Sequence, residues 1–387
     1  MRRRTQFHLP RSWKFILFPG LGLFLLLAIA ALATPVQATP FYQGDGPSND
    51  FCLACHQQEG IDITLGSESL PVTINPTLFG LSVHSQESIA CVDCHTNISD
   101  YPHPEVTAQS TRDFSVTLGE ACRDCHEEQY NAAPDSVHKR ALTEGKENAP
   151  LCADCHNPHT QGRLIGTESG QLTIAARLHV PQTCQQCHSE NYEKYKNSVH
   201  GKALTEEGNL DVPTCTDCHG VHNIQDPTTA TFRNTTPALC ADCHDNAEIM
   251  DKYGISTNVL ETYVADFHGT NVKLFGDQSP DEPTNKAVCT DCHGVHDIAK
   301  VDTPETGIAL RENLLIKCQR CHPDATANFP GAWMSHYVPS PQHYPIVYYV
   351  NLFYKIMIPA IIGGMIFFIL TDIYRRITSR GKGVQHS

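Results

Sequence analysis

The sequence predicts a protein that is mainly α with extensive loops, followed by one C-terminal transmembrane helix. Between residues 39 and 344 a five-residue unit, Cys-x-x-Cys-His, recurs nine times, about once per 34 residues. So little aliphatic sequence remains between the units that neither a sheet nor a large helical core can form. The connecting segments are rich in Pro, Asn, Asp and Gly, which favours helices of two to four turns, few strands and many turns. Near the C-terminus an apolar run of about 25 residues is long enough to cross a bilayer.

Every cysteine of the chain falls in one of the nine units. The 18 residues are Cys52, Cys55, Cys91, Cys94, Cys122, Cys125, Cys152, Cys155, Cys184, Cys187, Cys215, Cys218, Cys240, Cys243, Cys289, Cys292, Cys318 and Cys321. This spacing is typical of covalent c-type haem attachment, in which two thioethers hold the macrocycle and the following histidine binds the iron. The nine proximal histidines would be His56, His95, His126, His156, His188, His219, His244, His293 and His322.

Zinc sites and disulfides are the alternative explanations of paired cysteines. Zinc would leave the histidine after each second cysteine unexplained, and nine pairs do not divide into four-ligand sites. A disulfide framework is compatible with an exported chain but also gives that histidine no role. The sequence therefore predicts nine haem c groups, with short helices wrapped around a haem chain that itself forms the core.

The N-terminus predicts export. Five cations precede an apolar run from Phe15 to Ala33, and the small-residue stretch "TPVQATP" offers Ala38 as a cleavage point. Residues 1–38 are therefore a signal peptide or, because the run is long, an uncleaved N-terminal anchor. Both alternatives carry the following residues across the membrane, to the periplasmic or extracellular side.

The second apolar run predicts a single membrane crossing over residues 345–373. Tyrosines at its start resemble an interfacial aromatic belt, and the basic residues after it place residues 374–387 in the cytoplasm. Lys355 lies inside the run, where it would snorkel to the outer interface or face a partner subunit. The alternative is a buried helix of a soluble protein.

The exported region, residues 39–344, is strongly acidic. It contains 18 basic and 41 acidic residues, a net charge of −23 before any haem propionates are added. Nucleic acid is excluded as a partner by this charge, whereas a positively charged soluble or surface redox protein is favoured.

Internal repeats divide this region into two-motif modules. The segment from Cys122 and the segment from Cys184 share one pattern: a CxxCH, a Ser-Val-His twelve residues beyond its histidine, and a second CxxCH followed by another histidine at +3. The modules cover about 52–103, 122–159, 184–222 and 240–296, the last with an insertion, and an unpaired ninth unit covers 318–343. The clearest predicted helix is 191–204, "NYEKYKNSVHGKAL".

The remaining histidines match the expected number of distal ligands. Five occupy mid-module positions, namely His84, His138, His200, His268 and His336. Four occupy end-module positions, namely His103, His159, His222 and His296. Nine irons need nine distal ligands, so only His179 and His343 are left as surface residues, although His343 or Met334 are alternatives to His336 on the ninth iron.

Geometry limits which iron each of these histidines can reach. A histidine three residues after a proximal ligand cannot pass round to the opposite face of the same macrocycle. His159, His222 and His296 should therefore bind a neighbouring haem, the next one along, and so tie consecutive haems together. A mid-module histidine, with a loop of twelve or more residues, can reach its own haem or another, and the sequence leaves this open.

The repeated pairs resemble those of the doubled-CxxCH multihaem cytochromes c. The stretch "DFHG…AVCTDCHGVHDI…CQRCHPDATANF", leading into a C-terminal membrane helix, is similar to membrane-bound members associated with cytochrome b subunits. The resemblance covers about residues 50–375. It implies haems with two histidine ligands, close enough for electron hopping, and electron exchange with the quinone pool.

Two functions remain. The first is electron transfer between the quinone pool, or a cytochrome b or other quinol-oxidising membrane subunit, and a periplasmic or extracellular redox partner. The second is a reductase or dehydrogenase for a small nitrogen or sulfur compound, which requires an iron with an open position. Histidines suffice to fill every sixth position, and the CxxCK haem often used by related nitrite reductases is absent. These observations favour the carrier, and no catalytic residue is assigned.

Overall fold

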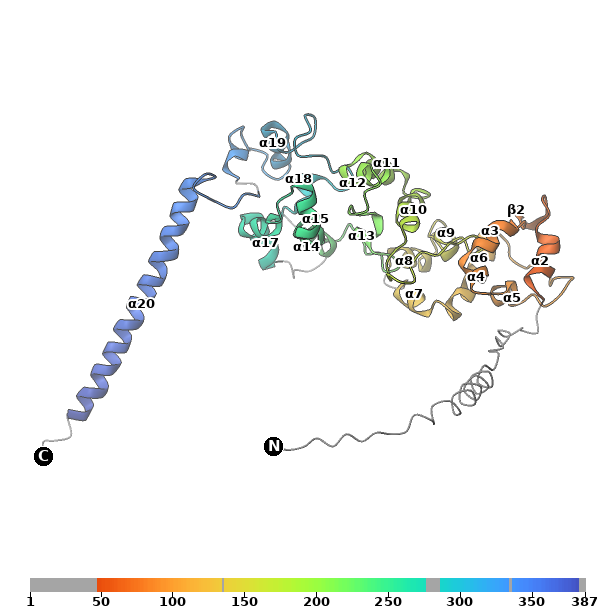
Figure 1. Cartoon of the computed structure of the whole chain (residues 1–387), viewed down its shortest axis with the longest axis horizontal. Coiled ribbons are helices and arrows are strands. Elements are labelled where there is room, and N and C mark those ends of the chain that lie inside the picture. Colours follow the sequence, from red (N-terminus) through yellow and green to blue (C-terminus); the bar gives the residue numbers. More distant parts are fainter. Residues whose placement is uncertain (1–46, 134–135, 276–285, 334–335, 383–387) are drawn as a thin grey trace, which may run out of the picture.

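A computed structural model describes residues 47–133, 136–275, 286–333 and 336–382 of the chain. The body is elongated and follows the sequence from one end to the other, and a long helix leaves it at the C-terminal end (Figure 1). The predicted signal peptide or anchor, residues 1–38, lies outside the described residues.

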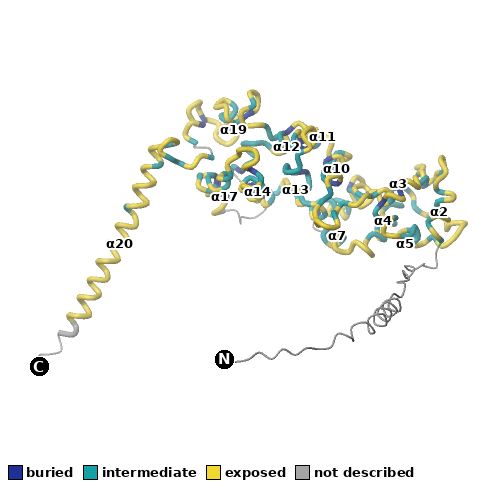
Figure 2. The backbone as a smooth tube through the Cα atoms, viewed as in Figure 1, coloured by how far each residue is buried: buried dark blue, intermediate teal, exposed yellow. Residues whose placement is uncertain are grey.

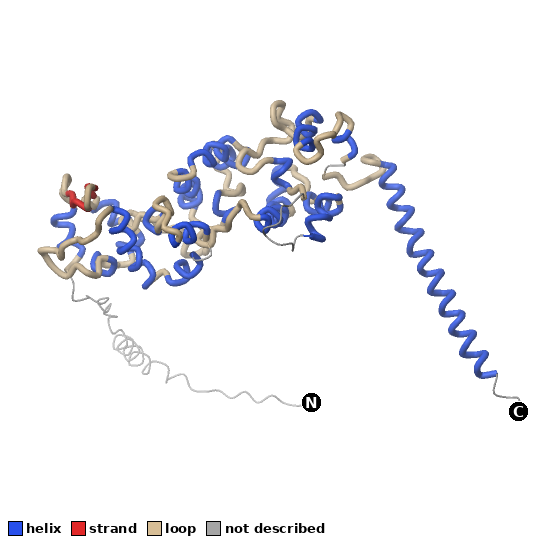
Figure 3. The backbone as a smooth tube through the Cα atoms, turned by 180° about the vertical axis from the view of Figure 1, so that it is seen from behind, coloured by secondary structure: helices blue, strands red, loops and turns tan. Residues whose placement is uncertain are grey.

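Short helices joined by loops make up the body, as predicted (Figure 3). In chain order the elements are α2 (Asn49–His56), β1 (Asp62–Leu65), β2 (Glu68–Pro71), α3 (Pro76–Leu81), α4 (Val83–Gln86), α5 (Cys91–Cys94), α6 (Thr111–Gly119), η1 (Glu120–Asp124), α7 (Glu127–Ala132), α8 (Val137–Thr143), α9 (Cys152–Cys155), α10 (Ile174–Gln185), α11 (Ser189–Asn197), α12 (Val199–Thr205), α13 (Cys215–His219), α14 (Ala230–His244), α15 (Ala247–Met250), η3 (Asp251–Tyr253), α16 (Val259–Ala265), α17 (Phe267–Phe275), α18 (Cys289–His293), α19 (Arg311–Gln319), η4 (Phe329–Ala332) and α20 (Pro345–Lys382).

The two strands form one antiparallel hairpin with Asp62 opposite Pro71 and Leu65 opposite Glu68. The hairpin follows the first motif directly and returns the chain to it. The ring Nδ1 of His56 lies 2.8 Å from the carbonyl oxygen of Val72, just beyond the hairpin. This small sheet therefore serves to position the first predicted haem ligand.

The first and second motifs of a module have different local structures. In α2 and α14 the first motif forms the C-terminal end of a longer helix. The second motif begins a helical turn of its own, as in α13 and α18, and its Asp side chain accepts the backbone N–H of the residue before the first cysteine. The same contact occurs in all four modules, from Ala90 to Asp93, Leu151 to Asp154, Thr214 to Asp217 and Val288 to Asp291. This Asp caps an otherwise very short helix and fixes the orientation of its cysteines.

The single helix predicted over 191–204 is wrong, because the segment forms two helices, α11 and α12. Ser198 has an extended backbone and its hydroxyl accepts the N–H of Gly201 at 3.1 Å, which caps α12. A β-carbon at Gly201 would lie 1.9 Å from the carbonyl oxygen of Tyr195, so the two helices meet too closely for any larger residue. The amphipathic pattern of the segment continues across the break, which is why periodicity alone missed it.

Side chains alone form only a small core in the described part of the chain. One cluster joins Tyr263, Val272 and Val288, while buried residues elsewhere are scattered along the body (Figure 2). This distribution agrees with the expectation that no large aliphatic core forms between closely spaced motifs.

α20 runs from Pro345 to Lys382, nine residues beyond the predicted 345–373. Over Pro345–Ser379 it is long and apolar enough to cross a membrane by length and composition, and it contacts nothing that buries it. The alternative of a buried core helix is thus not supported. The extension is the basic, polar segment after the apolar run, and Arg376 within it pairs with Asp372 at 2.7 Å.

Candidate haem-binding sites

The structure brings the predicted proximal and distal histidines together in nine pairs. Their ring centroids lie 5.8–6.4 Å apart. The pairs, proximal residue first, are His56–His103, His95–His159, His126–His84, His156–His222, His188–His138, His219–His296, His244–His200, His293–His336 and His322–His268.

This spacing fits one iron between two imidazoles. Two metal–nitrogen bonds of about 2 Å, plus about 1 Å from each nitrogen to its ring centre, give a separation of about 6 Å. All 18 cysteines are free of disulfides, so each motif keeps both thiols for thioether attachment. Among the described residues no group of three or more His, Cys, Asp or Glu is placed to hold a metal ion.

Hydrogen bonds orient several of these rings. The Nδ1 atoms of His56 and His84 lie 2.8 and 3.0 Å from the carbonyl oxygens of Val72 and Pro158. A carbonyl can only accept, so each Nδ1 must carry the proton and Nε2 keeps its lone pair for a metal. Such outer contacts fix the tautomer and orientation that a ligating histidine needs.

Burial also keeps two of the paired rings neutral. It is the main cause that lowers the pKa of His200 and of His293 to about 4, with a smaller contribution from the facing histidine in each pair. Both imidazoles are therefore unprotonated at neutral pH, the form that binds iron.

The pairing links each module to the next. The mid-module histidines His84, His138 and His200 face the first proximal histidine of the following module. In the opposite direction, the end-module histidines His159, His222 and His296 face the second proximal histidine of the preceding module. The sequence predicts that these histidines serve the next haem along, whereas the motif that each one faces is two units earlier in the sequence.

The two ends of the repeat explain the two irregular histidines. The first motif has no upstream module, and His103, at the drifted +8 position, faces its proximal His56. The ninth unit lacks a second motif, and its histidine His336 faces His293 of the eighth motif. The sequence leaves open which motif His336 serves and names it first for the ninth, but His322 of that motif faces His268 instead.

The two unassigned histidines lie outside the pairs. His179 is exposed on α10, and His343 is exposed and stacks on Tyr337 with ring centroids 5.3 Å apart. Met334, the other alternative for the ninth iron, lies outside the described residues.

Backbone hydrogen bonds also join neighbouring modules. The donor is the N–H of the residue just before a mid-module histidine. The acceptor is a carbonyl oxygen in the next module, two residues after its end-module histidine. These bonds join Val83 to Gln161, Val137 to Ile224 and Val199 to Ile298 at 2.7–2.9 Å. Ion pairs between Glu87 and Arg163 and between Arg140 and Asp226 reinforce the first two junctions.

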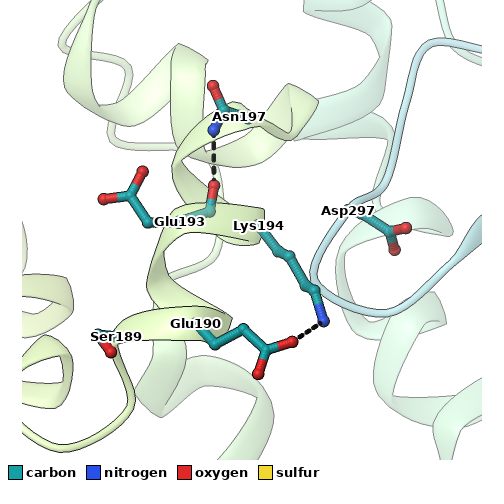
Figure 4. Close-up of a pocket in the computed structure, with 6 residues that line it drawn as sticks. All are labelled: Ser189, Glu190, Glu193, Lys194, Asn197 and Asp297. Carbon is teal, nitrogen blue, oxygen red and sulfur yellow. Dashed lines mark hydrogen bonds and ion pairs between the residues drawn. The ribbon is translucent and has the colours of Figure 1, made fainter.

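The third junction carries a shallow surface pocket. Its lining residues are Ser189, Glu190, Glu193, Lys194, Asn197 and Asp297 (Figure 4). Lys194 pairs with Glu190 at 2.8 Å and extends toward Asp297, which directly follows His296. The pocket is thus the outer surface of a contact between α11 and the loop after α18.

Cysteine contacts place the motifs in sequence order. Within each module the first cysteines of the two motifs are in hydrogen-bonding contact, in the pairs Cys52–Cys91, Cys122–Cys152, Cys184–Cys215 and Cys240–Cys289. Between modules, the last cysteine of one module lies close enough to interact with a cysteine of the next module or, after the fourth module, of the ninth motif. These pairs are Cys94–Cys125, Cys155–Cys184, Cys218–Cys240 and Cys292–Cys318. The nine motifs therefore form one continuous line.

Sequence reasoning missed the arginines that hold the second motif of a module. Arg177 and Arg233 lie seven residues before the first cysteine of their modules, on α10 and α14. Arg177 Nη2 lies 3.2 Å from Asp217 and 2.7 Å from the carbonyl oxygen of Val212. Arg233 binds both carboxylate oxygens of Asp291 and donates to the carbonyl oxygen of Lys286 at 2.8 Å. An arginine seven residues before the first cysteine of both modules was the sequence signal that could have revealed them.

Two buried tyrosines make a similar connection. The hydroxyls of Tyr195 and Tyr263 donate to the carbonyl oxygens of Pro213 and Ala287, just before the second motif of their modules. Burial raises the pKa of both tyrosines, so each remains a hydrogen-bond donor at neutral pH.

Arg233→Ala should destabilise the fourth module. The change removes a two-pronged ion pair with Asp291 and a backbone hydrogen bond, which together should contribute about 2 kcal/mol to the free energy of unfolding. Guanidinium unfolding of the haem-loaded protein, followed at the haem absorption, measures the loss. Arg233→Lys is the control, because it keeps the charge without the planar fork and should recover only part of the stability. Equal stability of the alanine variant and the unchanged protein would contradict this assignment.

Comparisons with known proteins support a family. Residues 108–189 match the family model of cytochrome c7 and related cytochromes c, and residues 207–249 match that of the doubled CXXCH motif. These matches support a multihaem cytochrome c family for the chain. Cytochrome c-type protein NrfB from Escherichia coli O6:H1 is 26% identical to this cytochrome over 117 residues, which are 29% of this chain and 61% of that relative. The cytochrome thus spans about three fifths of the length of this curated relative, and no solved structure matches it.

Proposed function

We propose that this multihaem cytochrome c is a membrane-anchored nonahaem electron carrier. It transfers electrons between the quinone pool, or a cytochrome b partner in the membrane, and a redox partner on the periplasmic or extracellular side. The observation that carries the proposal is the set of nine ring pairs, which provides every CxxCH histidine with a second histidine across an iron-sized gap. Two histidines per iron leave no open position for a substrate, which favours a carrier over a reductase.

The order of the motifs supports conduction along the chain. Their cysteines form one line from the first module to the ninth motif, so each haem would neighbour the next. Iron held by two histidines keeps its ligands in both oxidation states, and its reduction potential is lower than with a methionine ligand. The protein residues supply the ligands and hold neighbouring modules in register.

The two ends of the line suggest different partners. α20 follows the ninth motif closely, so the C-terminal end would meet the membrane. The N-terminal modules are farthest from that helix (Figure 1) and belong to a region with a net charge of −23, which suits a positively charged redox protein.

The haem-loaded protein should carry nine covalent haems. Each of the nine motifs keeps two free thiols and a facing histidine pair, so none is expected to stay empty. Intact-mass measurement of the purified chain gives the number directly, and fewer than eight haems would contradict the proposal.

Addition of carbon monoxide to the reduced protein tests the carrier role: a set of irons with two histidines each should give almost no spectral change. A strong response would indicate an open iron and favour the reductase.

A further inference from the structure

The fourth module differs from the others at one position beside its mid-module histidine. In the first three modules the residue two positions before this histidine is a serine, whereas the fourth module has Asp266 there. The serines are Ser82, Ser136 and Ser198, and all three are buried. Each serine hydroxyl accepts a backbone N–H of the following helix at 3.1–3.2 Å. Three modules thus have a neutral helix cap where the fourth has a carboxylate.

Asp266 is oriented toward the ring of His268. Its Oδ2 lies 3.4 Å from Nδ1 of His268 and accepts the indole N–H of Trp333 at 2.7 Å. Its Oδ1 accepts the backbone N–H of Phe267 at 2.5 Å. The side chain is only 25% exposed, so these contacts hold the carboxylate in place.

The same carboxylate lies between two ring pairs. His268 faces His322 of the ninth motif, and Trp333 meets His336 edge to face with ring centroids 5.8 Å apart. His336 faces His293 of the eighth motif, but its Nδ1 lies 3.2 Å from the hydroxyl of Thr262, a neutral group. Burial lowers the pKa of His336, and the charge of Asp266 opposes this, so Asp266 also acts on that ring. Its direct contact is with His268, however, and it therefore affects the two neighbouring pairs unequally.

A carboxylate beside a ligating imidazole changes the iron that the imidazole holds. It attracts the Nδ1 proton, which makes the imidazole a stronger electron donor to the iron. Its negative charge also stabilises ferric over ferrous iron. Other ring nitrogens in the described ranges contact neutral oxygens, namely those of Val72, Pro158, Gln161, Val259 and Thr262. Asp266 acts on His336 only through its charge, so its effect should be largest on the His268–His322 pair.

We propose that Asp266 is a positioning residue that lowers the reduction potential of the haem bound at Cys318 and Cys321. This inference rests on the proposed ligation of that haem by His322 and His268. Because electrons move spontaneously toward higher potential, an electron on the ninth haem would pass readily to the eighth. The haem nearest the membrane helix would then act as a donor to the rest of the chain.

Redox titration of the full-length, haem-loaded protein tests the inference. Asp266→Asn keeps the size of the side chain and an acceptor for Trp333 but removes the charge. One haem should become about tenfold easier to reduce, which corresponds to a midpoint about 59 mV higher for one electron. The haem between His293 and His336 should shift less, and the others should stay unchanged. Asp266→Ser introduces the residue of the other three modules and should give the same shift, so the test survives if one variant fails to fold. Asp297→Asn is the matched control, since it removes a charge beside His296 but its carboxylate accepts the backbone N–H of Val295 at 3.3 Å.

The His268→Ala variant separates the possible outcomes. The haem that shifts should be the one whose low-spin signal is lost in His268→Ala. A normal low-spin signal in His268→Ala would overturn the proposed ligation itself. If that signal is lost but both Asp266 variants leave every midpoint unchanged, or shift them no more than Asp297→Asn does, the role of Asp266 is wrong. A larger shift of the haem affected by His336→Ala than of the haem affected by His268→Ala would also overturn it.

Discussion

His222→Ala should convert the haem at Cys152 and Cys155 to a high-spin or substituted site, and leave the haem of its own motif intact. His222 follows His219 of the sixth motif, but its ring lies 6.1 Å from that of His156 in the fourth. His200→Ala should act on another iron, that of Cys240 and Cys243, because its ring lies 6.4 Å from that of His244. Magnetic resonance should show about one ninth of the low-spin signal lost in each variant.

A double variant identifies the affected iron. Without its two cysteines, the motif at Cys152 and Cys155 should carry no haem, and adding His222→Ala should then cause no further loss of low-spin signal. If His222 served the sequence-adjacent motif instead, the losses would add. His179→Ala is the control, since this exposed histidine lies outside the ring pairs and should change nothing. A full low-spin signal in both His222→Ala and His200→Ala would refute the ligand assignment.

The class of fold was predictable because the motifs themselves limit it. Nine units in about 300 residues leave room only for short helices and turns, and the structure is built of these. The break between α11 and α12 was not predictable from the hydrophobic period. It depends on Ser198 as a cap and on the N–H of Val199 bonding to Ile298, about a hundred residues away. Long-range backbone bonds of this kind leave no local signal in one repeat.

The candidate site shows the same division. The residues of the nine pairs could be chosen by counting repeated histidines against irons. Their partners could not, because each junction depends on how two modules dock. Comparison of the repeats would have shown more. The first motif has no upstream module and the ninth unit has no second motif, so His103 and His336 are expected to replace the histidines that a complete neighbouring module would supply. The −7 position of Arg177 and Arg233, and the Asp of each second motif, were equally visible as repeated letters.

Deletion of residues 345–387 should release a soluble, fully haem-loaded protein that dithionite reduces but quinol-supplied membranes do not. α20 has no packing contact that buries it, so the body should fold without it. Tyr344 follows His322 by only 22 positions, so the ninth motif would lie close to the membrane. α17 and α19, which carry His268 and lead into the ninth motif, lie at the end of the body from which α20 leaves (Figure 1). Reduction of the truncated protein by membranes at the full-length rate would contradict the proposal that electrons from the membrane enter at the ninth haem.

Replacement of 345–373 by an unrelated apolar helix distinguishes anchoring from recognition. The replacement keeps the body at the membrane but removes Lys355 and the adjacent Gly363 and Gly364, which offer one polar group and a close-packing surface for a partner helix. If an integral quinol-oxidising or b-type partner packs on this helix, the swapped protein should be membrane-bound yet reduced at least tenfold more slowly. Full-rate reduction would show that anchoring alone suffices and that the partner binds the haem-bearing body. In that case the ninth haem would still be the one that receives electrons from the membrane. The other motifs of the body lie farther from α20 along the line of cysteine contacts.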